Sequence, residues 1–235
     1  MVDEHKKKLI EALFDKKMLI CIFNGFTAGL PIYFLIQLIP AWLRSEAVDL
    51  KTIGFFGFVL LPYSFKYLWA PLLDRYVPPF FGRRRGWMLI TQVLLLLSMA
   101  SFAALNPATD ITQILYVGVA IGLFSATQDI ALDAYRRELL ADNELGLGNS
   151  FYANAYRVAG FVPGALGLIL ADYIPWPLVF IIISLFMIVG IIHTLSISEI
   201  TTDITPPGSL KEAVVGPFKD FFLSDGVKNG ILILL

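Results

Sequence analysis

The chain has 235 residues, of which 57% are hydrophobic and only 16% are charged, and its formal net charge is −1 at pH 7. A soluble domain carries roughly 25% charged residues, so this composition excludes an ordinary water-soluble fold and indicates an all-α integral membrane protein. The near-zero charge gives no reason to expect a nucleic-acid partner, and the one cysteine, Cys21, excludes an intramolecular disulfide and a CxxC metal site.

Six charge-poor apolar runs are each long enough to cross a hydrocarbon core of roughly 30 Å as a helix. They are predicted at residues 18–43, 53–70, 87–105, 111–132, 149–171 and 176–198. Residues 1–17, which include three consecutive lysines, are expected to form an amphipathic cytoplasmic segment ahead of this 18–198 bundle.

A hydrophilic stretch at 199–226 follows the sixth run, and a seventh apolar run begins at 227 and stops at Leu235. We interpret 199–226 as a cytoplasmic linker and 227–235 as the start of a seventh membrane helix. Six spans, a long linker and a new span are typical of the midpoint of a twelve-helix transporter. We therefore expect this chain to be an amino-terminal half whose carboxy-terminal six-helix half is missing.

Lysine and arginine residues in short loops mark the cytoplasmic side of a membrane protein. With the amino terminus inside, fourteen of them fall on the cytoplasmic side, and only Arg44 and Lys51 fall on the opposite side. This asymmetry predicts a cytoplasmic amino terminus.

One short loop, within WAPLLDRYVPPFFGRRRGW at residues 69–87, holds an unusual concentration of fixed charge. Topological anchoring explains its four arginines. Anchoring does not explain Asp74 or the glycines, so the residues alone leave a second role of this loop open.

The fourth predicted span, which includes GVAIGLFSATQDIALDAYRR, carries acids inside an apolar run. At 100° per residue, one face holds small residues followed by charged ones within roughly 80°. These residues are Gly118, Gly122, Ser125, Asp129, Asp133 and Arg136. Small residues let another helix approach closely, and buried acids require partners or water because a charge at the bilayer centre costs at least ~2.5–3.5 kcal/mol.

Arg157 in the fifth span is a candidate partner for these acids. Counted at 1.5 Å per residue from the cytoplasmic ends, Asp129 lies about 10 Å deep and Arg157 about 14 Å deep, so a pair between them is feasible. Such a pair is either a packing contact or part of a polar cavity in which Asp129 takes up a proton or contacts cargo. Lys66 in the second span either snorkels to the interface or attracts an anionic solute into that cavity.

Further polar residues within the spans complete the candidate proton and substrate pathway. Tyrosine rings would stack on sugar faces, and the cations would meet carboxylates. The full set is Tyr63, Lys66, Gln128, Asp129, Asn154, Tyr156 and Arg157.

The loop between the second and third spans resembles the signature of the major facilitator superfamily, an Asp-Arg pair followed by glycine and a basic pair. The matching residues are Asp74, Arg75, Gly82, Arg83 and Arg84. The resemblance implies a six-helix bundle of 3+3 repeats and a loop that acts as an intracellular gate, joined by charge contacts to an acid at the cytoplasmic end of span four. Asp133, with Arg136 beside it, sits where that acid is expected, while the insertion at 76–81 departs from the family spacing.

Three motifs, LPYSFKYLWAPLLDRYVPPFFGRRRGW, SATQDIALDAYRRELL and NSFYANAYRVAG, closely resemble the AmpG-type muropeptide permeases of Gram-negative bacteria. This resemblance runs from about residue 24 to 198. It implies proton-driven import of anhydro-muropeptides from periplasm to cytoplasm across the bacterial inner membrane. No cofactor or metal is expected, and the partners are the lipid bilayer, protons and the anionic solute.

Other functions remain as alternatives. Acetyl-CoA transporters share parts of these motifs, and glycines and a proline in span five partly resemble an antiporter pattern of small-molecule exporters. An enzyme is not expected. Asp129 and Asp133 at i, i+4 have the spacing of magnesium-binding acids in intramembrane prenyltransferases, but no second acidic cluster lies on another span.

Overall fold

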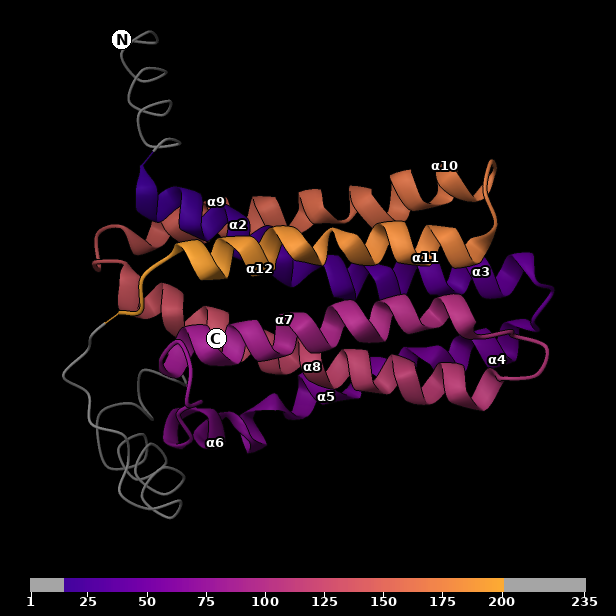
Figure 1. The fold of residues 1–235 in the computed structure, drawn as a ribbon, viewed down its shortest axis with the longest axis horizontal. Coiled ribbons are helices and arrows are strands. Elements are labelled where there is room, and N and C mark those ends of the chain that lie inside the picture. Colours follow the sequence, from indigo (N-terminus) through magenta and orange to yellow (C-terminus); the bar gives the residue numbers. More distant parts are fainter. Residues whose placement is uncertain (1–14, 201–235) are drawn as a thin grey trace, which may run out of the picture.

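The computed structural model describes residues 15–200, which form a bundle of helices lying side by side, without a strand in that range (Figure 1). The all-α prediction is therefore confirmed for this part of the chain. The predicted amino-terminal segment, linker and seventh run lie outside the described residues, apart from 15–17 and 199–200.

Within residues 15–200, five helical segments are long and apolar enough to cross a membrane, and each overlaps a predicted span. They are Lys16–Ser45, Arg83–Ala104, Ile111–Leu139, Leu145–Ala171 and Trp176–Ser196. The first comprises α2 (Lys16–Tyr33), the π-helical turn η1 (Phe34–Leu38) and α3 (Ile39–Ser45); the next two are α7 (Arg83–Ser101) with η4 (Phe102–Ala104), and α8 (Ile111–Leu139). The fourth comprises α9 (Leu145–Ala159), the π-helical turn η5 (Val162–Leu166) and α10 (Gly167–Ala171). The fifth comprises α11 (Trp176–Leu185) and α12 (Met187–Ser196).

The second predicted span is not one continuous helix. It is a chain of short pieces: α4 (Leu50–Phe55), η2 (Phe56–Leu60), α5 (Leu61–Phe65), η3 (Lys66–Leu68) and α6 (Ala70–Arg75). Pro62 and Pro71 stand near the starts of α5 and α6, where a proline supplies no backbone N–H for the preceding turn. The broken segment nevertheless packs along α8, which contacts η2, α5 and α6 (Figure 1).

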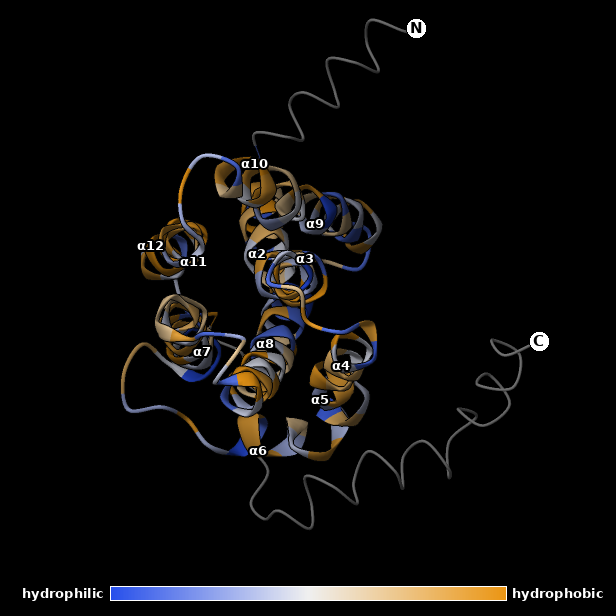
Figure 2. Cartoon of the chain, turned by 90° about the vertical axis from the view of Figure 1, so that its right-hand side faces the viewer, coloured by the Kyte–Doolittle hydropathy of each residue, from blue (hydrophilic) through white to orange (hydrophobic). Residues whose placement is uncertain are grey.

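Hydrophobic residues run along every helix of the bundle (Figure 2), and they are both buried in its interior and exposed on its outside. Inside, Phe34, Trp42, Phe102 and Phe180 form an aromatic core with ring centroids 4.8–6.0 Å apart. Outside, many large apolar side chains are exposed, and that of Phe161 is 68% exposed. A bundle that is apolar on both sides is suited to a lipid environment rather than to water.

The small face of α8 receives the broken segment at very short range. A β-carbon added at Gly122 would lie 2.1 Å from the carbonyl oxygen of Val59, and one at Gly118 would lie 3.0 Å from the Val59 side chain. The prediction that this face admits a close neighbour is therefore confirmed, and the neighbour is η2.

Gly122→Ala is expected to lower the unfolding temperature of the purified protein, because the added methyl must push the backbone of η2 away from α8. Overpacking of this kind costs about 1–3 kcal/mol. Gly57→Ala is the matched control, since nothing lies within 4 Å of a β-carbon at Gly57. Equal melting temperatures for the two variants in a thermal-unfolding assay would contradict the close contact at Gly122.

Candidate functional site

A cluster of charged side chains joins the broken segment to α8 and α9. Lys66 Nζ donates a hydrogen bond to Asp129 Oδ2 and lies 3.9 Å from Asp133 Oδ2. Arg136 Nη2 donates to Asp133 Oδ1 at 2.8 Å, and the Tyr152 hydroxyl donates to Asp129 Oδ1 at 3.1 Å. We call Lys66, Asp129, Asp133, Arg136 and Tyr152 the central cluster; its two cations and two carboxylates cancel in charge.

The central cluster is packed on one side and open on the other. The Asp129 side chain is 17% exposed, whereas that of Asp133 is 44% exposed. The guanidinium of Arg136 lies 3.9 Å from the centre of the Tyr152 ring, a cation–π contact. Both acids are therefore paired, and Asp133 is the more accessible of the two.

Tyr63 lies beside this cluster. Its hydroxyl is 2.5 Å from Ser125 Oγ, and Ser125 precedes Asp129 by one helical turn on the same face of α8. The structure thus brings Tyr63, Lys66 and Asp129 together, as the pathway hypothesis requires.

The predicted Asp129–Arg157 pair is wrong. Asp129 pairs with Lys66 and Tyr152, and Arg157 is exposed in a separate cavity. Depth along two neighbouring helices placed the two charges at similar levels, but it did not give the direction in which Arg157 points. Lys66 faces the acids from the neighbouring segment instead, so it does not snorkel away from them.

The remaining pathway residues form no hydrogen bond or ion pair with the central cluster among the described residues, although the Tyr156 ring lies 6.5 Å from that of Tyr152. Gln128 is 1% exposed, and neither its amide nitrogen nor its oxygen has a hydrogen-bond partner among the described residues. The Tyr156 ring packs 5.7 Å from that of Tyr33. Asn154 is exposed and donates to the Ser150 carbonyl at 2.8 Å, so it is not part of the central cluster.

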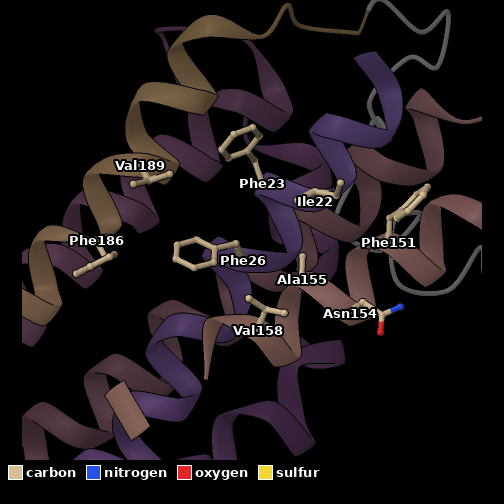
Figure 3. Close-up of a pocket in the computed structure, with 9 residues that line it drawn as sticks. All are labelled: Ile22, Phe23, Phe26, Phe151, Asn154, Ala155, Val158, Phe186 and Val189. Atoms are coloured by element: carbon tan, nitrogen blue, oxygen red, sulfur yellow. The ribbon is translucent and has the colours of Figure 1, made fainter. Parts of the chain in front are cut away.

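Asn154 instead borders an apolar groove of about 610 Å³ between α2, α9 and the α11–α12 segment (Figure 3). Phe23, Phe26, Val158 and Phe186 are among the residues that line it. The amide of Asn154 points away from Phe186, so this groove presents hydrocarbon rather than hydrogen-bonding groups.

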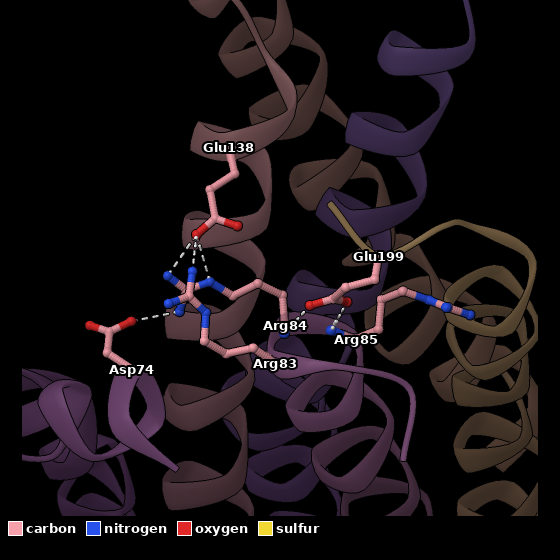
Figure 4. Close-up of polar contacts among 6 residues, drawn as sticks. All are labelled: Asp74, Arg83, Arg84, Arg85, Glu138 and Glu199. Atoms are coloured by element: carbon pink, nitrogen blue, oxygen red, sulfur yellow. Dashed lines mark hydrogen bonds and ion pairs between the residues drawn. The ribbon is translucent and has the colours of Figure 1, made fainter. Parts of the chain in front are cut away.

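A second charged cluster fixes the loop between α6 and α7 to the end of α8 (Figure 4). Arg84 Nη1 donates to Asp74 Oδ1 at 2.6 Å, and Arg84 Nη2 lies 2.8 Å from Glu138 Oε1. Arg83 Nη2 donates to the same Glu138 oxygen at 3.1 Å. We call Asp74, Arg83, Arg84 and Glu138 the loop cluster; the side chains of Arg84 and Glu138 are each only 9% exposed.

The acid that α8 contributes to this loop is Glu138, so the expectation that Asp133 fills that place is wrong. The helix α8 continues to Leu139, about two turns beyond the predicted end at Leu132, and this extension carries Glu138 to the start of α7. Asp133 and Arg136 belong to the central cluster instead. Arg75 stacks over its neighbour Tyr76 at 5.9 Å rather than joining the loop cluster.

Glu199, which sequence reasoning missed, completes the start of α7. Its carboxylate accepts hydrogen bonds from the backbone N–H groups of Arg84 and Arg85 at 2.8 and 3.0 Å (Figure 4). Gly82, with φ +83°, makes room for it, because a β-carbon there would lie 2.6 Å from Glu199 Cδ. The sequence offered one signal for this contact. Glu199 lies just beyond the sixth span, and the first turn of α7 contains no acidic residue of its own.

The same end of the bundle carries two more ties. The Arg85 guanidinium donates to the Thr194 and Leu195 carbonyls at 3.0 Å, which fixes the end of α12. Lys17 Nζ donates to Glu144 Oε2 at 2.6 Å, and this hydrogen bond lowers the pKa of the Glu144 carboxyl below its ordinary value. Polar contacts are therefore concentrated at the end that the lysine and arginine distribution assigns to the cytoplasm.

The chain is similar in sequence to several known proteins. The chain is 46% identical to an uncharacterized protein of Haemophilus influenzae over 97% of its own length and 54% of that protein. It is 43% identical to the anhydromuropeptide permease of Escherichia coli K12, over 92% of the chain and 44% of the permease. It is 30% identical to putative transporter AmpG 4 of Rickettsia felis, over 91% of the chain and 54% of that protein.

The chain therefore spans about half the length of the curated relatives it matches. The family model described as Major Facilitator Superfamily matches residues 14–235. Together with the helical bundle and its apolar exterior, this match identifies a multi-pass membrane protein of the transporter class. The chain belongs to the major facilitator superfamily.

Proposed function

We propose that this protein is a proton-coupled secondary transporter that imports anhydro-muropeptides from the periplasm to the cytoplasm across the bacterial inner membrane. The observation that carries the proposal is the central cluster, in which Asp129 is held by Lys66 and Tyr152 inside an otherwise apolar bundle. The 43% identity to the Escherichia coli anhydromuropeptide permease supports the choice of cargo.

The chemistry of the central cluster suits a proton carrier. Ionisable groups within membrane helices are costly and mark ion or substrate pathways. The carboxylate of Asp129 accepts hydrogen bonds from Lys66 and Tyr152. When Asp129 takes up a proton, Asp133 is close enough to Lys66 to take the place of Asp129 as its counter-ion. A proton is thus gained without leaving Lys66 unpaired.

The same pairing weighs against an enzyme that binds a diphosphate through magnesium. Such a site needs carboxylates free to coordinate the metal. Here Asp129 bonds to Lys66 and Asp133 bonds to Arg136.

The loop cluster is the proposed inner gate. It joins α6, α7 and α8 at the end predicted to face the cytoplasm, and the side chains of Arg84 and Glu138 are almost entirely buried. In the outward-facing state these contacts hold the cytoplasmic end closed, and they open when the carrier turns inward. The proposal puts the amino terminus in the cytoplasm, as the distribution of lysine and arginine predicts.

Uptake of labelled anhydro-muropeptide into vesicles that contain the protein from its complete reading frame tests this function. We expect accumulation above the external concentration, and at least a fivefold reduction when a protonophore collapses the proton gradient. Labelled acetyl-CoA serves as the control cargo and is not expected to accumulate. Undiminished muropeptide uptake with the protonophore would refute proton coupling, and uptake of acetyl-CoA alone would refute the cargo.

A further inference from the structure

Arg157 is a cation placed near the middle of its membrane span. It lies 12 residues after Leu145 and 14 before Ala171, the ends of that span, which is roughly 18 Å from the nearer end at 1.5 Å per residue. The side chain is nevertheless exposed. An exposed charge at this depth is stable only beside water or an opposite charge, because insertion into hydrocarbon is costly.

No opposite charge is supplied by the described residues 15–200, in which Arg157 takes part in no ion pair. The central cluster does not provide one either, since Asp129 and Asp133 are already matched by Lys66 and Arg136. Within the described residues Arg157 therefore has no compensating negative charge, and its exposed side chain can be reached by a negatively charged group from outside this part of the chain.

The cavity around Arg157 is suited to such a group. It has a volume of about 430 Å³ and is lined by both π-helical turns of the bundle, through Gln37 of η1 and Gly164 of η5. Gln37 lies directly over Gly164, where an added β-carbon would be 2.1 Å from its amide oxygen. π-Helical turns occur frequently at functional sites because the extra residue changes the direction of neighbouring side chains.

We propose that this cavity binds a carboxylate of the transported solute, with Arg157 as the cation and the Gln37 amide as a second donor. A guanidinium binds a planar carboxylate through two parallel hydrogen bonds, and Tyr33 offers an adjoining apolar surface. The depth of Arg157 separates this site from lipid headgroups at either surface. The assignment of the carboxylate to the solute rests on the proposed transport function, but the presence of an anion site can be measured separately.

The first measurement compares two cargoes in the protein from its complete reading frame: an anhydro-muropeptide, and the same compound with its carboxylates converted to amides. Arg157→Gln is expected to raise the KM of the acid about tenfold, because one charge-assisted contact is lost. The KM of the amide is expected to change less than twofold. Arg157→Lys is expected to recover part of the affinity for the acid. An equal change for both cargoes would overturn the proposal.

The second measurement does not depend on transport. Ala165 lines the cavity and is exposed, whereas the cysteine at position 21 is buried, so Ala165→Cys introduces a new site for maleimide labelling. An acetylated tripeptide with a free carboxylate is expected to slow labelling, and the same tripeptide as its amide is not. Protection must disappear when Arg157→Gln is added.

The two measurements separate the two claims. Absence of protection by the carboxylate, or equal protection by the amide, would overturn the anion site whatever the protein transports. Protection that depends on Arg157 in a protein that imports no muropeptide would retain the anion site and refute the proposed cargo. Protection by the carboxylate that persists in the Arg157→Gln variant would likewise count against Arg157 as the binding cation.

Discussion

Asp129→Asn is expected to reduce proton-driven uptake about 100-fold while the protein still reaches the membrane in normal amount. Asparagine keeps one acceptor oxygen for Lys66, and its NH2 group can donate to the Tyr152 hydroxyl oxygen, but it cannot bind and release a proton. Loss of a group that transfers protons costs 10²–10⁴-fold in rate. Lys66 keeps Asp133 as a counter-ion at 3.9 Å, so folding is preserved. Initial uptake rates, divided by the amount of protein on an immunoblot, measure the effect.

A second readout separates a proton carrier from a packing contact. Exchange of labelled for unlabelled cargo across the membrane, with equal pH on both sides, needs no net proton movement. Asp129→Asn is therefore expected to keep exchange within about threefold of the parent while uphill uptake is lost. Loss of both activities together would identify Asp129 as a binding or structural residue instead.

The double variant Asp129→Asn/Lys66→Gln sharpens this test, because it restores the charge balance of the central cluster without restoring a titratable group. If the pair only neutralises charge, uphill uptake recovers; if Asp129 carries the proton, uptake stays low. Asp142→Asn is the control, since Asp142 is 86% exposed and its pair with Arg137 is at the surface. It is expected to change uptake less than twofold.

The sequence predicted the apolar spans and the small, acidic face of α8, because both depend on composition and on a regular period of 3.6 residues. It did not identify the partner of Asp129. The segment that carries Lys66 alternates between α-helical and 3₁₀-helical turns, and each 3₁₀ residue rotates the chain by about 120° instead of 100°. The direction of Lys66 therefore cannot be derived by counting along one regular helix.

The acid that pairs with Arg84, Glu138, was missed for a related reason. Hydropathy marks where an apolar run stops, so it ended the fourth span at Leu132, while the helix itself continues through polar residues to Leu139. Glu138 lies on that polar extension, and only the packing of α8 against the start of α7 shows that it meets Arg84. Long-range contacts between loops and helix ends, like that of Glu199, carry no periodic signal.

Arg84→Met is expected to destabilise the protein by about 3 kcal/mol, because removing one partner of a buried ion pair leaves the other desolvated. This loss of stability is at the lower end of the range for breaking a buried ion pair, because Arg83 still reaches Glu138 at 3.1 Å. The backbone N–H of residue 84 remains, so the contact with Glu199 is retained. Unfolding in a denaturing detergent measures the loss, and Arg137→Gln, which removes an exposed pair, is expected to cost less than about 1 kcal/mol.

Adding Glu138→Gln to Arg84→Met distinguishes a gate from a structural contact. The second change removes the negative charge that Arg84 had neutralised, while the amide oxygen at position 138 can still accept from Arg83, so stability is expected to rise again by about 1 kcal/mol or more. The contacts that Arg84 makes with Asp74 and with the end of α8 are still absent. Uptake per folded molecule is therefore expected to stay low in the stabilised double variant. Recovery of uptake in step with stability would mean that these charges hold the bundle together and do not control access to its interior.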